Sequence, residues 1–175
     1  MDKPSIQEID EIRKQGFRPQ VVGCFLNNKK LLFIFDKKYN LWQLPQGGID
    51  NLETVDQAFG REMIEELGEI FIKTNDTGSI SLIGEDQVMF PTTTQGSRDL
   101  KSDNGEVIFM KGKKYFFLTS IANNPDIDIE STEFDDYKWV SFSEGLALTD
   151  KIYQKGKQRI TMKVLNILKE SNLLS

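Results

Sequence analysis

The stretch PQGGIDNLETVDQAFGREMIEELGE, Pro45–Glu69, decides the fold expected of this chain. Two glycines lead into a polar loop, and a run with three crowded glutamates follows. Thr54 and Gln57 have the spacing of a capping box, in which two residues at a helix start exchange hydrogen bonds. Gly68 stands where helices commonly stop. The sequence therefore predicts a helix from about residue 55 to residue 67.

The glutamates share one side of this predicted helix. At about 100° per residue, Glu62, Glu65 and Glu66 fall within one sector, next to an apolar stripe that begins at Phe59. Like charges at this spacing destabilise an isolated helix by roughly 0.2–0.5 kcal/mol per pair, so a cation is expected near them; Arg61 neutralises only part of the charge. Hard oxygen ligands favour Mg²⁺ or Mn²⁺ over zinc or copper. The alternative is a solvated acidic helix surface without a ligand.

Composition excludes several classes of catalytic site. The chain has no histidine, which rules out a Ser-His-Asp triad, a Cys-His pair and a histidine-containing zinc site. The single cysteine, Cys24, lies in the apolar run VVGCFL and is expected to be a small buried residue. A net charge of −5 disfavours broad nonspecific binding to nucleic acid but allows a local basic patch. Carboxylates are left to perform any acid or base chemistry.

The pattern of the whole chain predicts one α/β domain over residues 1–175. A short N-terminal helix is expected at about 5–15 and a C-terminal helix at about 158–169, and the polar segment 91–105 is expected to be a long loop. No apolar run is long enough to span a membrane and the N-terminus lacks a signal-peptide core, so we expect a cytoplasmic protein. The expected strands are QVVGCFL, KLLFIF and LWQL before the central helix, and GSISLI, QVMF, KKYFFLTSI, IDI and YKWVSF after it. Strands mixed with three helices indicate a sandwich.

The spacing within residues 47–69 carries a more specific signal. The stretch resembles the signature of the Nudix hydrolases, G-x5-E-x7-R-E-U-x-E-E-x-G-U, in which U is apolar. The one departure is Glu69, which stands where an apolar residue is usual, and Ile70 is expected to take over its burial. The matching positions are Gly47, Glu53, Arg61, Glu62, Met63, Glu65, Glu66 and Gly68.

The resemblance implies a Nudix-type α/β/α sandwich with a mixed central sheet. It implies that Glu62, Glu65 and Glu66 bind a divalent metal, Mg²⁺ or Mn²⁺. It also implies that Arg61 orients Glu53 through an ion pair. The general base is then Glu62 or Glu66, between which the sequence does not choose.

Segments outside this signature, which we call the Nudix box (residues 47–69), resemble one branch of the family. GFRPQVVG, LWQLPQGGID, KKYFFL and EFDDYKWVSF, between about Gly16 and Phe142, are similar to bacterial RNA pyrophosphohydrolases and asymmetric diadenosine polyphosphate hydrolases. The branch implies that Glu133 lies near the metals and is a further candidate base, the alternative being a solvated loop acid. It also implies that Arg18 approaches the substrate phosphates, the alternative being a surface arginine.

Four lysines are candidates for holding phosphates. Lys113 and Lys114 either neutralise substrate charge or lie at the end of an exposed strand. Lys155 and Lys157 lie near the place where the branch has basic substrate-binding residues, although the local spacing differs.

Glycine and aromatic residues add further substrate-binding candidates. Gly47 and Gly48 let the backbone come close to a ligand. Trp42 and Tyr115 either stack on bases or belong to the core. The segment QVMFPTTTQGSRD departs from the branch pattern, which leaves base recognition open.

The expected activity is hydrolysis of a phosphoanhydride in a nucleotide 5′ polyphosphate. The first choice of substrate is the 5′-triphosphate end of RNA, from which pyrophosphate would be removed, as in mRNA decay. The alternative within the enzymes is a diadenosine polyphosphate hydrolase. The alternative of another class is a nonenzymatic Nudix domain that senses nucleotides; no protein partner is indicated.

Overall fold

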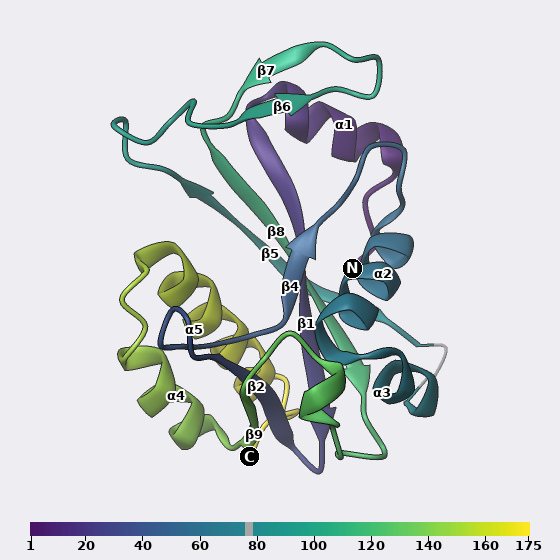
Figure 1. Ribbon diagram of the computed structural model, residues 1–175, viewed down its shortest axis with the longest axis vertical. Coiled ribbons are helices and arrows are strands. Elements are labelled where there is room, and N and C mark those ends of the chain that lie inside the picture. The colour runs from purple at the N-terminus through teal and green to yellow at the C-terminus, as the bar shows by residue number, and fades with distance from the viewer. Residues whose placement is uncertain (76–78) are drawn as a thin grey trace.

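A seven-stranded mixed sheet forms the centre of the molecule (Figure 1). The computed structural model describes residues 1–75 and 79–175. The sheet has the order β3-β2-β1-β8-β5, with β4 paired to β1 and β9 paired to β2. Strands β1 and β8 run parallel, and every other described pair is antiparallel. The strands are β1 (Phe17–Asn27), β2 (Lys30–Asp36), β3 (Leu41–Gln43), β4 (Gln46–Gly48), β5 (Ser81–Met89), β8 (Gly112–Ile121) and β9 (Asp136–Val140).

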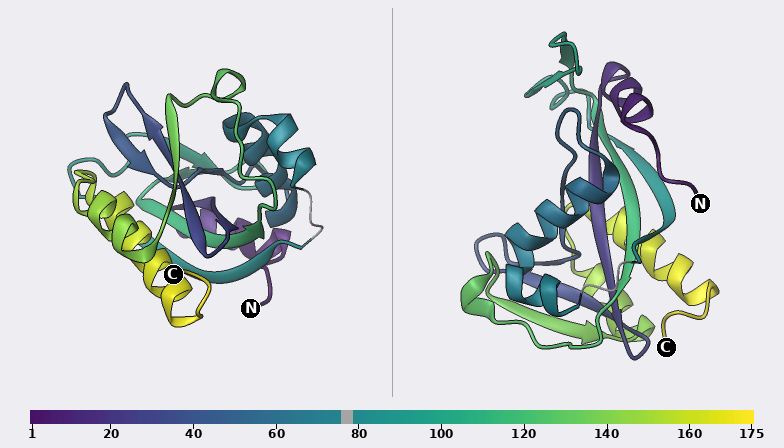
Figure 2. Two further views of the ribbon diagram at one scale, coloured as in Figure 1. Left: turned by 90° about the horizontal axis from the view of Figure 1, so that it is seen from below. Right: turned by 90° about the vertical axis from the view of Figure 1, so that its right-hand side faces the viewer.

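Helices cover both faces of this sheet, which makes the single α/β domain expected from the sequence (Figure 2). Because side chains alternate along a strand, β1 feeds two cores. Val21 and Phe25 pack with the apolar stripe of α2, whereas Val22 and Cys24 pack with α5. The helices are α1 (Ile6–Lys14), α2 (Val55–Leu67), α3 (Glu69–Thr74), α4 (Phe142–Asp150) and α5 (Lys155–Glu170).

Helix ends follow the local signals in the sequence. Thr54 caps α2 and exchanges hydrogen bonds with Gln57, and Gly68 follows the helix with a φ of +89°. Ser5 and Glu8 form the corresponding capping box of α1. These caps satisfy backbone donors that a helix start leaves unpaired, so they fix where the helices begin.

Several expected elements differ in the structure. GSISLI and QVMF belong to one strand, β5, although Gly78 lies outside the described residues. IDI is not a strand, since a 3-10 turn occupies Ile129–Ser131. Helices α3 and α4 were not expected, and α4 begins at Phe142, the last residue of the expected strand YKWVSF. Ile70 is 70% exposed, and Phe71 is the residue that is buried after the box.

The segment expected as a long loop carries a small hairpin. Strands β6 (Asp99–Lys101) and β7 (Val107–Phe109) pair as a separate two-stranded sheet at one end of the molecule, beside α1 (Figure 1). No helix in the described part of the chain is long and apolar enough to cross a membrane.

Candidate active site

Arg61 connects helix α2 to the loop that precedes it. Its Nε and Nη2 atoms donate to the two carboxylate oxygens of Glu53, each at 2.8 Å, and Nη2 also donates to the carbonyl of Gly48 at 2.8 Å. The arginine lowers the pKa of Glu53, mainly through these hydrogen bonds. The ion pair expected between the two residues is therefore present, and it fixes the loop against the helix.

Glu62 and Glu65 lie next to the same guanidinium group. Arg61 Nη1 donates to Glu62 at 2.6 Å, and Glu65 is 3.7 Å from Nη1. The Glu62 side chain is 15% exposed and that of Glu65 is 54% exposed. Burial raises the pKa of Glu62 despite the arginine, because removal from water disfavours the charged carboxylate.

Glu66 is the most strongly perturbed carboxyl of the set. The backbone N–H of Gln46, in strand β4, donates to its Oε2 at 2.8 Å. The pKa of Glu66 is raised to about 8, mainly by burial and also by the charges of Glu62 and Glu133, while the Gln46 hydrogen bond and the charge of Lys157 oppose the rise. A carboxyl that holds its proton near neutral pH for these reasons is one that a nearby cation would readily deprotonate.

The glutamates of α2 lie on one side of the helix, but in the described part of the chain they are not spaced as the ligands of one metal ion. Ser131, in the segment before β9, lies against Gly68 at the end of α2, and the charge of the exposed Glu133 from the same segment acts on Glu66. Within residues 1–75 and 79–175, no three Asp, Glu, Cys or His side chains are already spaced to hold a metal ion. Arg61 instead contacts Glu62, so binding a cation would require side chains to reorient. The donors themselves are all carboxylate oxygens, which fits a hard divalent ion.

The two glycines of β4 make room for opposite halves of the site. A Cβ at Gly47 would collide with the carboxylate of Glu62. A Cβ at Gly48 would lie 2.7 Å from Nη2 of Arg18. Because neighbouring residues of a strand face opposite sides, the acidic helix and the arginine approach this strand from its two faces.

Basic side chains gather on the side of Arg18. Arg18 pairs in register with Lys113 across β1 and β8. Burial, together with the positive charges of Arg18, Lys157 and Arg98, lowers the pKa of Lys113 to about 8. Lys157 Nζ donates to the side-chain oxygen of Gln43 at 2.6 Å. Burial lowers the pKa of Lys157, and the charges of Glu66 and Asp36 offset only part of this effect. The charge of Lys157 therefore acts on both Glu66 and Lys113.

Other sequence candidates lie outside this cluster. Lys114 points to the opposite face of β8 from Lys113 and forms an ion pair with Glu85 at 2.6 Å. Lys155 is exposed at the first residue of α5, beside a cavity of about 850 Å³ that Lys113 and Tyr115 also line.

The two aromatic candidates are packed against protein. Tyr115 is 4% exposed and belongs to the core, where burial raises its pKa to about 12. Trp42 contacts Phe35 with ring centroids 5.0 Å apart, and the ammonium of Lys138 lies 4.8 Å from its ring.

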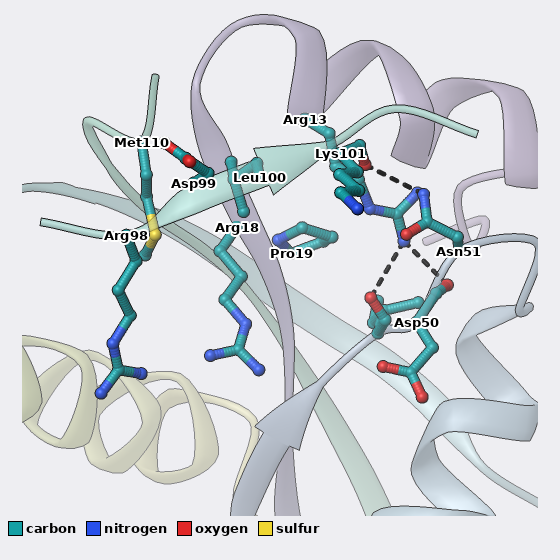
Figure 3. Close-up of a pocket in the computed structure, with 11 residues that line it drawn as sticks. Arg13, Arg18, Pro19, Asp50, Asn51, Arg98, Asp99, Leu100, Lys101 and Met110 are labelled. Atoms are coloured by element: carbon teal, nitrogen blue, oxygen red, sulfur yellow. Dashed lines mark hydrogen bonds between the residues drawn. The ribbon is translucent and has the colours of Figure 1, made fainter. Parts of the chain in front are cut away.

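Arg98 is a site residue that sequence reasoning missed. It lies just before β6, in the segment expected to be a loop, and it influences Lys113 from there. Figure 3 shows Arg98, just before β6, and Arg18, in β1, extending their guanidinium groups in the same direction. The arginine in QGSRDL was visible in the sequence, but its position depends on where the hairpin packs.

Comparison with known proteins shows the family to which this chain is similar. The family model of the NUDIX domain matches residues 17–161. The RNA pyrophosphohydrolase of Pasteurella multocida (strain Pm70) is 30% identical over 169 residues, covering 91% of this chain and 81% of that protein. The RNA pyrophosphohydrolase of Rickettsia conorii (strain ATCC VR-613 / Malish 7) is 33% identical over 147 residues, covering 79% of this chain and 86% of that protein.

Solved structures share the fold at lower sequence identity. The dihydroneopterin triphosphate pyrophosphohydrolase of E. coli aligns with a TM-score of 0.56 at 16% identity, over 85% of this chain and 97% of that one. An Ap4A hydrolase of C. elegans aligns with a TM-score of 0.53 at 16% identity, over 88% of this chain and 96% of that one. With its box helix, mixed sheet and matching family model, this chain belongs to the Nudix hydrolase family.

Proposed function

We propose that this hydrolase cleaves a phosphoanhydride in a nucleotide 5′ polyphosphate, and that its substrate is the 5′-triphosphate end of RNA. The observation that carries the proposal is the pair of glycines in β4, where Gly47 makes room for Glu62 and Gly48 makes room for Arg18. Carboxylates suited to a divalent ion and cations suited to phosphate thus adjoin one short strand. A polyphosphate that crosses the edge of β4 opposite β1, where no described strand pairs with it, would reach both kinds of group.

The acidic half supplies the proposed metal ligands. Glu62, Glu65 and Glu66 of α2, together with Glu133, would hold Mg²⁺ or Mn²⁺, since all of them offer oxygen donors. When bound, such an ion supplies neutralisation of phosphate charge and acidification of water. Arg61 keeps Glu53 and the carbonyl of Gly48 in place beside these ligands.

Side chains of the protein accept the proton of the attacking water and stabilise the leaving group. A carboxylate, Glu62 or Glu66, accepts the proton of the attacking water, because no histidine is available and both lie in partly dehydrated surroundings. Glu133 is the third candidate for this role. Arg18 and Lys113 face the phosphates and stabilise the negative charge that builds up on the leaving group.

The choice of RNA rests on the relatives. Those reported above at 30% and 33% identity are named RNA pyrophosphohydrolases, and each match covers more than three quarters of this chain. The Ap4A hydrolase shares the fold only, so diadenosine polyphosphate is the second candidate substrate.

A substrate panel tests the proposal. Wild type, Glu66→Gln and Glu65→Gln would be compared with Mg²⁺ or Mn²⁺ on triphosphorylated RNA and on diadenosine tetraphosphate, with products resolved by mass. We expect RNA to be the better substrate and both variants to lose at least about tenfold in turnover while staying folded. Faster cleavage of the dinucleotide would select the second candidate. Full turnover in both variants would refute the metal assignment, and no turnover of any substrate by wild type would favour a nucleotide sensor.

A further inference from the structure

A cavity of about 340 Å³ lies beside Arg18 (Figure 3). It is bounded by β1, the β6–β7 hairpin and the loop after β4. The charged residues that line it are four bases, Arg13, Arg18, Arg98 and Lys101, and two acids, Asp50 and Asp99. A basic surface of this kind stands out in a chain whose net charge is −5.

The two arginines nearest the active site lack counter-charges. Across residues 1–75 and 79–175, neither Arg18 nor Arg98 forms a hydrogen bond or an ion pair through its side chain. Arg13 differs, since its guanidinium group donates to Asp103 and to two backbone carbonyls. Both unpaired arginines add positive potential at Lys113. Cations that gather without an anion favour binding of a multiply charged anionic ligand.

The acids of the lining do not supply that anion. The carboxylate of Asp50 lies 3.4 Å from Arg61 Nη2, so it belongs to the network of α2. The carboxylate of Asp99 points away from the guanidinium groups of Arg98 and Arg18 in Figure 3. The guanidinium end of the cavity therefore stays positive.

The hairpin that carries Arg98 is anchored to the active-site loop. Asp103, in the turn of the hairpin, accepts from Arg13 Nη1 at 3.1 Å and from Asn51 Nδ2 at 2.8 Å. Asn51 Nδ2 also donates to the carbonyl of Lys101 at 3.0 Å, and the backbone N–H of Asp103 donates to Asp10 at 2.7 Å. Arg13 is only 3% exposed, so this connection is sheltered from water. The hairpin is thus held beside the loop.

We propose that this cavity binds a phosphate group of the substrate that is not attacked, with Arg98 and Arg18 as its donors. The inference rests on the proposed function, because it extends the same substrate beyond the acidic residues. Arginine suits the task, since its planar fork makes paired hydrogen bonds to phosphate oxygens. Gly48, which leaves room for Arg18, directly follows Gly47, which leaves room for Glu62, so the cavity and the proposed metal site adjoin the same short strand. The phosphate comes either from the first internucleotide linkage of RNA or from the outer part of a dinucleoside polyphosphate.

The first test measures binding without catalysis. Inorganic tripolyphosphate would be titrated into wild type, Arg98→Gln and Lys151→Gln by calorimetry, in buffer freed of divalent ions. Lys151→Gln makes the same charge change at an exposed residue that follows α4 and does not line the cavity. We expect affinity to fall about tenfold in Arg98→Gln and less than about twofold in the control. Equal affinities in the two variants would overturn the inference.

This readout separates the inference from the proposed function. If wild type cleaves no phosphoanhydride and Arg98→Gln still weakens tripolyphosphate binding selectively, the function is wrong and the anion site stands. If wild type hydrolyses RNA ends and Arg98→Gln binds tripolyphosphate as the control does, the function stands and the site is wrong.

A second test identifies the source of the phosphate. KM would be measured for wild type and Arg98→Gln on a triphosphorylated dinucleotide, on a nucleoside triphosphate and on diadenosine tetraphosphate. A roughly tenfold rise confined to the triphosphorylated dinucleotide assigns the site to an internucleotide phosphodiester. A similar rise for diadenosine tetraphosphate assigns it to an outer phosphate. Unchanged KM values for all three substrates would overturn the inference.

Discussion

Replacing Arg61 by lysine should weaken both the fold and the activity. Arg61 donates four hydrogen bonds of 2.6–2.8 Å, two of them to Glu53, one to Glu62 and one to the carbonyl of Gly48. An ammonium group cannot reproduce the planar fork, so at least two of these bonds are lost. Hydrogen bonds to charged groups contribute roughly 1.5–3 kcal/mol each, and the 30% exposure of the Arg61 side chain argues for the lower end. We expect the free energy of unfolding to fall by about 3 kcal/mol.

Urea denaturation measures this loss, with an unchanged slope showing that the unfolded states are comparable. Arg159→Lys is the matched control, because Arg159 also forms a two-point contact, with Asp86 at 2.9 and 3.0 Å, but its side chain is 61% exposed. We expect the control to lose less than about 1 kcal/mol. Metal-dependent turnover of Arg61→Lys should fall about 10- to 100-fold because Glu53 is no longer oriented. Stability within about 0.5 kcal/mol of wild type, or a loss equal to that of the control, would refute this reasoning.

Three further predictions follow from burial and packing. Gly47→Ala should weaken Mg²⁺ affinity at least about tenfold, because the added Cβ displaces Glu62. Gly60→Ala is the control, since an added Cβ there meets nothing within 4 Å. Calorimetric titration of Mg²⁺ into both variants measures the difference, and equal affinities would contradict the prediction. Because the pKa of Glu66 is raised from 4.5 to about 8, the metal-free folded protein holds a proton that the unfolded chain releases. The contribution of Glu66 to stability should therefore be fully present below pH 4.5 and fall by up to about 1.4 kcal/mol per pH unit as the pH rises to about 8, so the difference in urea stability between wild type and Glu66→Gln should change over this range, and a constant difference would contradict the reasoning. Cys24 is fully buried and burial raises the pKa of its thiol, so a thiol reagent should label the protein only in denaturant, and rapid labelling of the native state would show the burial to be wrong.

The elements predicted correctly are those whose signals are local. The capping pair Thr54 and Gln57 and the stop at Gly68 bound α2 in the sequence as they do in the structure. Ser141 and Glu144 form the same kind of cap at the start of α4, but Ser141 lies within YKWVSF, whose apolar pattern predicts a strand. The sequence therefore predicts a strand up to Phe142 and does not predict the helix that begins there.

The site was predictable only as far as neighbouring residues determine it. The ion pair between Arg61 and Glu53 spans one loop and one helix, and the family signature implied it. The different positions of Lys113 and Lys114 depend on which face of β8 each residue occupies, which the short sequence KGKKY does not reveal. The place of Arg98 depends on tertiary contacts of the hairpin through Asp103, far along the chain from Arg13.

The hydrogen bond from the Gln46 amide to Glu66 gives the protein a built-in spectroscopic reporter. The proton of that amide points at a carboxyl proposed to bind the cation, so its NMR resonance should move when Glu66 ionises or changes its ligand. Because β4 is only three residues long and Gln46 is paired with Val22 of β1, the signal comes from a backbone position that is fixed in the sheet. One assigned peak in a nitrogen-15 spectrum would then follow events at the carboxylates without any added label.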